Sequence, residues 1–144
     1  MKDSTFTAYF KPKSFNISGA VKSGKGTIDP VYQACEFQKT VTFVAEADPG
    51  YQVKAWPDGS TGFRYGYRVA EPRDTVIRVE FEPIIYNIGV ASGGNGSAAI
   101  VCSGVPADNC AVAYESTFSI TATPDAGYTF DRWSDGSQTA TRNN

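Results

Sequence analysis

Eleven residues at positions 127–137, GYTFDRWSDGS, combine three aromatic side chains with two carboxylates. Aromatic rings offer apolar contact area and carboxylates accept hydrogen bonds, so this cluster could bind a ligand. The sequence GYQVKAWPDGS at 50–60 is identical at six of eleven positions, each 77 residues earlier. A motif that recurs at a fixed distance indicates a structural repeat before it indicates a ligand.

The repeated motif has a structural explanation at each position. Gly127 permits a backbone conformation closed to other residues, and Asp135 forms a turn pair with the glycine after it. Tyr128 and Phe130 face the core from one strand, whereas Trp133 caps the core edge or, in the alternative, binds a ligand at the surface. We assign a structural role to Gly50, Tyr51, Trp56, Asp58, Gly59, Gly127, Tyr128, Phe130, Trp133, Asp135 and Gly136.

Catalytic chemistry is not indicated. The chain has no His, so the usual general base of Ser and Cys nucleophiles is missing. Asp58 and Asp135 occupy equivalent turn positions in separate repeats, which does not suit a pair of cooperating carboxylates. We therefore predict no enzyme, no catalytic residue and no cofactor.

Metal ligands are poorly placed. Three cysteines without any His cannot supply a four-ligand zinc site. Asp125, Asp131 and Asp135 lie close together and could hold calcium, but their spacing fits no calcium loop, so no metal is predicted. Cys102 and Cys110 bracket the turn-rich stretch SGVPADN and are a candidate disulfide; the alternative is that both stay reduced as small buried side chains.

Composition narrows the classes of partner. The 13 basic and 15 acidic residues give a net charge of −2 without a basic run, which argues against nucleic acid. No apolar segment is long enough to span a membrane. The start, MKDSTFTAYF, lacks the apolar core of a signal peptide, so the chain is cytoplasmic or part of a longer exported protein.

The repeat extends beyond the aromatic motif. Residues 118–128 match 41–51 at an offset of 77, and residues 86–97 match 15–27 at an offset of 70 to 71. The second copy therefore has about six extra residues between these two matches. We place them in the loop that holds Cys102 and Cys110, here called the cysteine loop. Residues 3–17 match 74–88 at 71. The predicted domains are 1–12 as the last strand of a preceding repeat, 13–83 as the first full module, and 84–144 as a second module lacking its last strand.

Strand patterns dominate the chain. Ile77, Val79 and Phe81 alternate with charged residues, which predicts a half-buried strand over 74–82. Strands are also predicted from Tyr51 in the first copy and Tyr128 in the second. The best helical candidate is 29–37. The predicted fold class is mainly β, a small α+β fold at most, in two tandem modules with a period of 71–77 residues.

A candidate binding surface lies between turns at 60–74. It combines aromatic and Arg side chains, which are enriched at interaction hot spots. The alternative is an ordinary hairpin with one half-buried face. The residues are Phe63, Arg64, Tyr65, Tyr67 and Arg68.

The order Gly-x-Gly, strand, Ala-x-Pro-x-x-Gly-Tyr-x-Phe-x-x-Trp-x-Asp-Gly at 94–137 resembles the internalin-type B-repeat family, especially its divergent branch in bacterial surface proteins. Residues 24–60 match with departures, such as Val53 in place of the Phe. The resemblance implies small β-grasp-like modules in tandem on exported proteins, extracellular or at the cell surface, that act as stalks or as adhesive or protein-binding units. It brings no catalytic residues, and the cysteines depart from the pattern.

Three hypotheses remain. The first is a stalk and adhesion unit whose partner is a protein or glycan on a cell surface or matrix. The second is self-association by strand exchange through residues 3–11, for which the alternative is an unpaired strand that frays. The third is a carbohydrate-binding accessory domain that uses Trp56 or Trp133.

Overall fold

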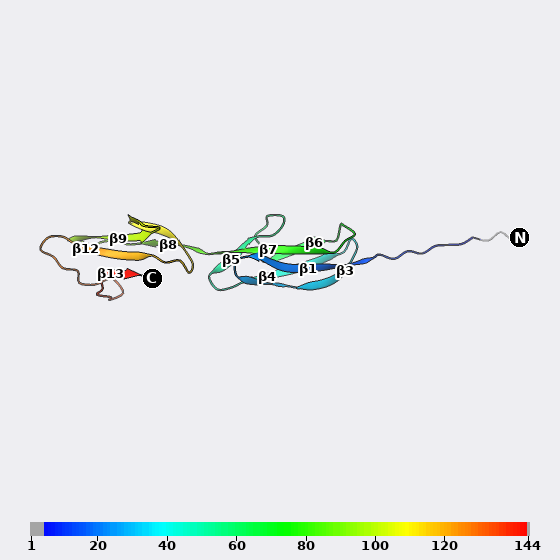
Figure 1. Cartoon of the computed structure of the whole chain (residues 1–144), viewed down its shortest axis with the longest axis horizontal. Coiled ribbons are helices and arrows are strands. Elements are labelled where there is room, and N and C mark those ends of the chain that lie inside the picture. The colour runs from blue at the N-terminus through cyan, green and yellow to red at the C-terminus, as the bar shows by residue number, and fades with distance from the viewer. Residues whose placement is uncertain (1–4, 144) are drawn as a thin grey trace. The chain divides into compact units, whose positions relative to one another are not determined.

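The computed structural model describes residues 5–143, and these residues contain thirteen strands and no helix (Figure 1). The prediction of a mainly β chain is therefore confirmed. Two compact units divide the chain, Met1–Glu82 and Pro83–Asn144, here called the first and second unit.

The first unit is built from two sheets around one core. One sheet has the order β3-β1-β7-β5 and the other β2-β4-β6. Strands β1 and β7 pair in parallel, whereas the β1–β3, β2–β4 and β4–β6 pairs are antiparallel. Both sheets contribute to a single apolar cluster that includes Ile17, Phe43 and Val79. The strands are β1 (Ser14–Ser23), β2 (Gly26–Asp29), β3 (Tyr32–Glu36), β4 (Thr40–Ala47), β5 (Tyr51–Ala55), β6 (Arg64–Arg68) and β7 (Thr75–Pro83).

Strand β7 shows the predicted alternation. Ile77, Val79 and Phe81 are buried, whereas Arg78 is exposed and Glu80 is half-buried on the opposite face. Because successive side chains of a strand point to opposite faces, β7 buries one apolar row while it pairs with β1 on one edge and β5 on the other.

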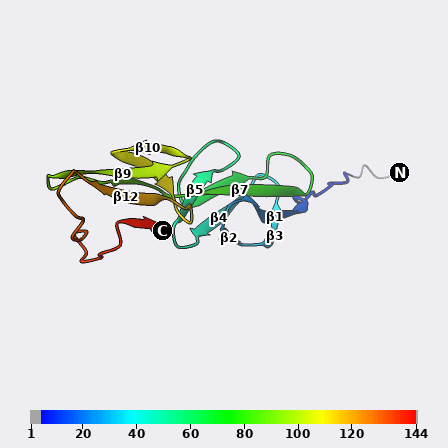
Figure 2. The same cartoon turned by 60° about the vertical axis from the view of Figure 1, so that its left-hand side comes forward.

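The second unit has a smaller set of strands. Its sheets have the orders β10-β9-β12-β13 and β11-β8. Figure 2 shows β9 and β12 side by side, and the long connection after β12 runs without a strand to β13. The strands are β8 (Ile85–Gly89), β9 (Gly96–Cys102), β10 (Val105–Ala107), β11 (Asn109–Ala113), β12 (Ser119–Pro124) and β13 (Thr141–Asn143).

The strand registers of the two units correspond. Ser14 pairs with Glu36 between β1 and β3, and their counterparts Ile85 and Ala113 pair between β8 and β11. Similarly, the β4–β6 register is repeated between β12 and β13, and the β2–β4 register between β9 and β12. The extra residues of the second copy form the end of β9 and the β10 hairpin, in the cysteine loop where the offsets placed them.

Two strands of the first unit have no counterpart among the described residues of the second. No strand pairs with β8 as β7 pairs with β1, and residues 128–132, the counterpart of β5, form no strand. The prediction of a strand from Tyr128 is therefore wrong. The physical reason is that β5 owes its backbone pairing to β7, so its counterpart has no neighbouring edge to join.

Two other predictions concern local structure. The helical candidate at 29–37 is wrong, because β3 forms there and pairs with β1 in a sheet. Residues 5–12, the described part of the N-terminal strand predicted at 1–12, form no strand and are exposed. Residues 1–4 of that segment lie outside the described residues.

Candidate functional site

The repeated Trp-x-Asp-Gly-Ser motif closes the same loop in each unit. Trp56 Nε1 donates to the carbonyl of Gly62 at 2.6 Å, and Trp133 Nε1 donates to the carbonyl of Thr139 at 2.9 Å. The carboxylate of Asp58 accepts from the Ser60 amide at 2.9 Å, and its counterpart in the second unit does the same. These contacts stay within the loop, which supports a structural role for the motif.

The motif carboxylates are held in their ionised form. Hydrogen bonds from Ser60 lower the pKa of Asp58. The hydrogen bond from Arg142, followed by that from the Ser137 amide, lowers the pKa of Asp135. A carboxylate with a lowered pKa is a poor proton donor, so neither side chain suits general acid chemistry.

The glycines of the motif adopt backbone conformations that other residues avoid. Gly50 and Gly127 have φ of 82° and 85°, and Gly59 and Gly136 have 82° and 86°. Each lies in a tight turn beside the aromatic residues, in the left-handed region that favours glycine.

The two tryptophans differ in their surroundings. Trp56 is 3% exposed and stacks on Tyr65, with ring centroids 5.1 Å apart. Trp133 is half-buried, and its ring centroid lies 5.3 Å from that of Phe130. The position equivalent to Tyr65 is occupied by Arg142 in the second unit. Only Trp133 presents part of its ring to solvent.

The predicted binding surface at 63–68 is not one surface. Tyr65 and Tyr67 pack against the core of the first unit, whereas Arg64 and Arg68 are exposed on the other face of β6. Strand alternation separates the aromatic rings from the guanidinium groups. Among the aromatic residues of this stretch, Phe63 remains accessible: it is 61% exposed, and the Arg64 guanidinium lies 5.4 Å from its ring centroid.

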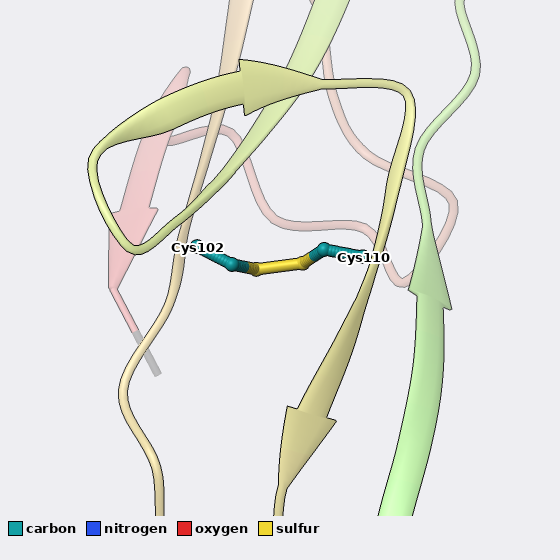
Figure 3. The surroundings of a disulfide bond; sticks show 2 residues. All are labelled: Cys102 and Cys110. Atoms are coloured by element: carbon teal, nitrogen blue, oxygen red, sulfur yellow. A yellow bond between two sulfur atoms is a disulfide. The ribbon is translucent and has the colours of Figure 1, made fainter.

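The candidate cysteines are joined. A disulfide links Cys102 at the end of β9 to Cys110 on β11, with Cα atoms 6.4 Å apart (Figure 3). Because β9 and β11 belong to different sheets, this bond ties the two sheets of the second unit together. Cys35 is free and buried in the first unit.

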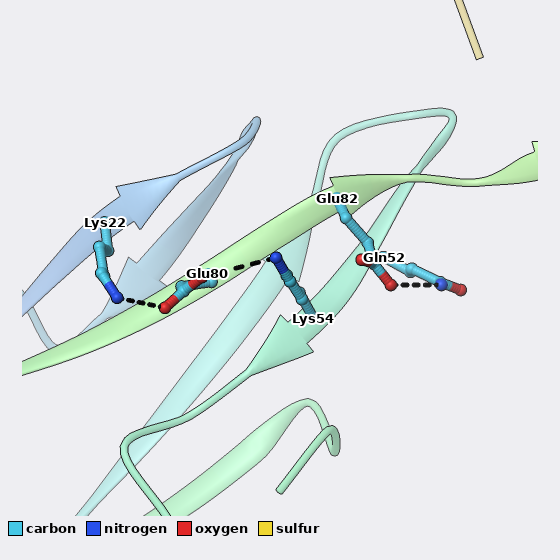
Figure 4. Close-up of polar contacts among 5 residues, drawn as sticks. All are labelled: Lys22, Gln52, Lys54, Glu80 and Glu82. Atoms are coloured by element: carbon cyan, nitrogen blue, oxygen red, sulfur yellow. Dashed lines mark hydrogen bonds and ion pairs between the residues drawn. The ribbon is translucent and has the colours of Figure 1, made fainter. Parts of the chain in front are cut away.

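The exposed face of β7 is held by polar contacts (Figure 4). Lys22 on β1 donates to Glu80, and Lys54 on β5 lies 4.0 Å from the same carboxylate. Gln52 donates to Glu82 at 3.1 Å. The Lys22 hydrogen bond is the main cause of the lowered pKa of Glu80. These side-chain contacts link β7 to β1 on one side and to β5 on the other.

No group of three or more metal-ligating side chains occurs among the described residues. Asp131 pairs with Arg132, and Asp135 pairs with Arg142. A cation at these acids would have to replace two arginines. No helix in the part of the chain that the structure describes is long and apolar enough to cross a membrane.

The second unit contains a groove of about 770 Å³ that was not among the predicted sites. Its lining includes Gly94, Gly96, Ile120, Tyr128, Phe130 and Trp133. Tyr128 is 55% exposed there, so the prediction that it faces the core is wrong, although its counterpart Tyr51 packs against the core of the first unit. The sequence signal for this groove was the predicted module 84–144 without a last strand, because among the described residues no strand pairs with β8 as β7 pairs with β1.

Comparison with known proteins identifies a family for part of the chain. No curated protein and no solved structure matches the chain. Residues 86–144, nearly the whole of the second unit, match the family described as the divergent InlB B-repeat domain, and this match confirms the resemblance to internalin-type B-repeats over that part of the chain.

Proposed function

We propose that the chain is a pair of tandem, non-catalytic repeat modules from a bacterial surface or secreted protein, acting as a stalk and as an adhesion or protein-binding unit. The proposed modules are 13–83 and 84–144, β-grasp-like in type, with 1–12 as the last strand of a preceding repeat. The observation that carries this proposal is the family match at 86–144 together with the strand registers that the first unit shares with it.

The proposed location is extracellular or at the cell surface. Divergent B-repeats are typical of bacterial surface proteins, and a disulfide is a bond that persists in oxidising compartments. Protease treatment of intact producing cells tests the location, because a surface protein is degraded while a cytoplasmic protein survives. Survival of the chain in intact cells, with degradation after lysis, would contradict the location.

The proposed partner is a protein or glycan of a cell surface or matrix. Phe63 and Arg64 offer the accessible aromatic and cationic pair of the first unit. The test is biolayer interferometry of the immobilised chain against matrix proteins and glycans. Saturable binding that Phe63→Ala and Arg64→Ala weaken would support adhesion.

The matched control is Val76→Ala, which removes an apolar side chain with 46% exposure elsewhere on the same unit. Equal loss of binding with this control would mean non-specific contact. If the chain binds none of these partners, the adhesion function is contradicted and the chain acts as a spacer.

A carbohydrate-binding function is favoured at one tryptophan only. Trp56 is 3% exposed and cannot stack on a sugar in the folded unit, whereas Trp133 borders the groove. Oligosaccharide titration should therefore change Trp133 fluorescence in a Trp56→Phe variant. No change across a broad panel would eliminate this alternative.

A further inference from the structure

We propose that the groove of the second unit accepts residues 3–11 of a second copy of the chain, here called the donor segment, as a parallel strand beside β8. This inference goes beyond the stalk and adhesion function. It is an alternative to the placement of residues 1–12 as the last strand of a preceding repeat, because one segment cannot complete both modules. It rests on the contacts that β7 makes in the first unit and on the open positions that correspond to them in the second.

Strand β7 completes the first unit through close backbone contact. A Cβ atom on Gly24 would come within 2.2 Å of the Phe81 carbonyl oxygen, and one on Gly26 within 2.7 Å of Phe81 Cζ. The two glycines therefore form a cradle that the backbone and ring of Phe81 fill. Phe81 is 2% exposed as a result.

The same cradle is empty in the second unit. Gly94 and Gly96 are the counterparts of Gly24 and Gly26, 70 residues later. A Cβ atom on Gly94 would meet no atom within 4 Å, and the three atoms nearest to one on Gly96 belong to the backbone of Thr123 and Pro124. Both glycines line the groove, so the space that Phe81 occupies in the first unit is open here.

The residues around the groove are correspondingly less buried. Phe43 of the first unit is fully buried, and its counterpart Ile120 is half-buried. Trp56 is 3% exposed, and its counterpart Trp133 is half-buried. The second unit thus has an apolar surface of the shape that a strand covers in the first.

The donor segment carries the residues that would fill this surface. It matches β7 at an offset of 71, which places Phe6, Ala8 and Phe10 at the positions of the three buried side chains of β7. Phe6 and Phe10 are 93% and 94% exposed and have no core of their own. Phe10 is identical to Phe81 and would enter the glycine cradle.

A polar contact specifies the register. The carboxylate of Asp74, just before β7, accepts hydrogen bonds from the backbone and side chain of Asn16 at 2.8 and 3.3 Å. The counterparts of these residues are Asp3 and Asn87, both identical in type.

Charges on the outer face favour the donor segment over a strand like β7. In the first unit Glu80 faces Lys54 (Figure 4). The counterpart of Lys54 is Asp131, which would repel a glutamate, but the donor segment has the neutral Tyr9 at that position and Lys11 two residues later. Asp131 and Lys11 thus carry the opposite charges to their counterparts Lys54 and Glu82, which favours pairing of the donor segment with the second unit.

The contact would join different surfaces of two copies. A head-to-tail contact of this kind does not close on itself as a symmetric dimer does, so copies can add in series. An unpaired strand edge readily takes up an extended segment, and backbone hydrogen bonds then supply affinity while alternate side chains supply specificity.

The first test measures the mass of the full chain by light scattering across a broad concentration series. The expected result is a mass that rises from monomer to dimer and higher species. Phe6→Asp and Phe10→Asp should keep the chain monomeric and folded, because both side chains are exposed in the free chain. A wild-type monomer at every concentration would overturn the proposal.

Tyr9→Asp is the matched control. Tyr9 is 90% exposed but belongs to the outward row of the donor segment, so its substitution should leave assembly intact. If Tyr9→Asp abolishes assembly as completely as Phe10→Asp does, the association is general hydrophobic adhesion and the proposed register is wrong.

A cross-link separates exchange between copies from pairing within one. Ala20 pairs with Arg78 between β1 and β7, and the corresponding positions are Ala91 and Thr7. A Thr7→Cys chain mixed with an Ala91→Cys chain should give a disulfide-linked heterodimer. A chain carrying both substitutions that cross-links as a monomer at high dilution would instead show pairing within one chain and overturn the proposal.

Discussion

The ring of Phe81 packs directly on Gly26, where a Cβ atom would lie 2.7 Å from Phe81 Cζ. The same Cβ atom would lie 2.6 Å from the Glu46 carbonyl oxygen, so a larger residue has no room on either side. This contact connects the Gly-x-Gly turn before β2 with the last strand of the unit, far apart in sequence.

Gly26→Ala should therefore destabilise the first unit by about 1 to 3 kcal/mol, the usual cost of overpacking. Urea denaturation followed by circular dichroism measures the change. Gly66→Ala is the control, because a Cβ atom there meets only Thr40 Cγ2 at an ordinary 3.6 Å. Equal stability of the two variants would contradict the close packing of Phe81.

Trp56→Ala should cost about 3 to 5 kcal/mol, as expected for truncation of a buried aromatic side chain. The ring is 3% exposed and its indole nitrogen is bonded to the Gly62 carbonyl, which would lose a partner. Trp133→Ala should cost clearly less, because the half-buried Trp133 loses fewer contacts. A Trp133→Ala cost equal to that of Trp56→Ala, in urea denaturation of the full chain, would mean that the groove is closed in solution.

Sequence periodicity is enough to predict a strand that has one buried face. The alternation of Ile77, Val79 and Phe81 predicted β7 correctly, because a period of two reports burial directly. The offset between matching residues also located the extra residues in the cysteine loop. An insertion changes this offset only for the residues that follow the insertion, so the change from 70–71 to 77 marks its position.

The sequence could not predict features that depend on a partner strand. Tyr128 has the local pattern of a strand, but β5 forms only where β7 offers an edge. The groove arises from the same missing neighbour. The surface predicted at 63–68 does not form as one face, because strand alternation turns Tyr65 inward and Arg64 outward.

Cys110→Ser should destabilise the second unit by about 2 to 3 kcal/mol, because the disulfide closes a short loop and limits the freedom of the unfolded chain. Thermal unfolding measures the change, with and without a thiol reductant. The reductant should lower the stability of the wild type to that of the variant and leave the variant unchanged. Identical wild-type curves in both conditions would show that the cysteines are not joined in solution.

The Lys22–Glu80 pair should make the first unit sensitive to acid. The Lys22 hydrogen bond lowers the pKa of Glu80 below its ordinary 4.5, so the folded state holds this proton less tightly than the unfolded state. The resulting stabilisation is fully present above pH 4.5 and is lost as the pH falls through the folded pKa. Urea midpoints taken downward from neutral pH should therefore fall less steeply in Glu80→Gln than in the wild type.

Lys22→Met tests whether that acid sensitivity belongs to the pair. It removes the main cause of the lowered pKa and should flatten the same part of the pH profile as Glu80→Gln does. The double variant should then resemble either single variant, because two groups that act through one contact are not additive. Additive flattening would mean that Glu80 is held by other groups, with Lys54 at 4.0 Å the next to replace.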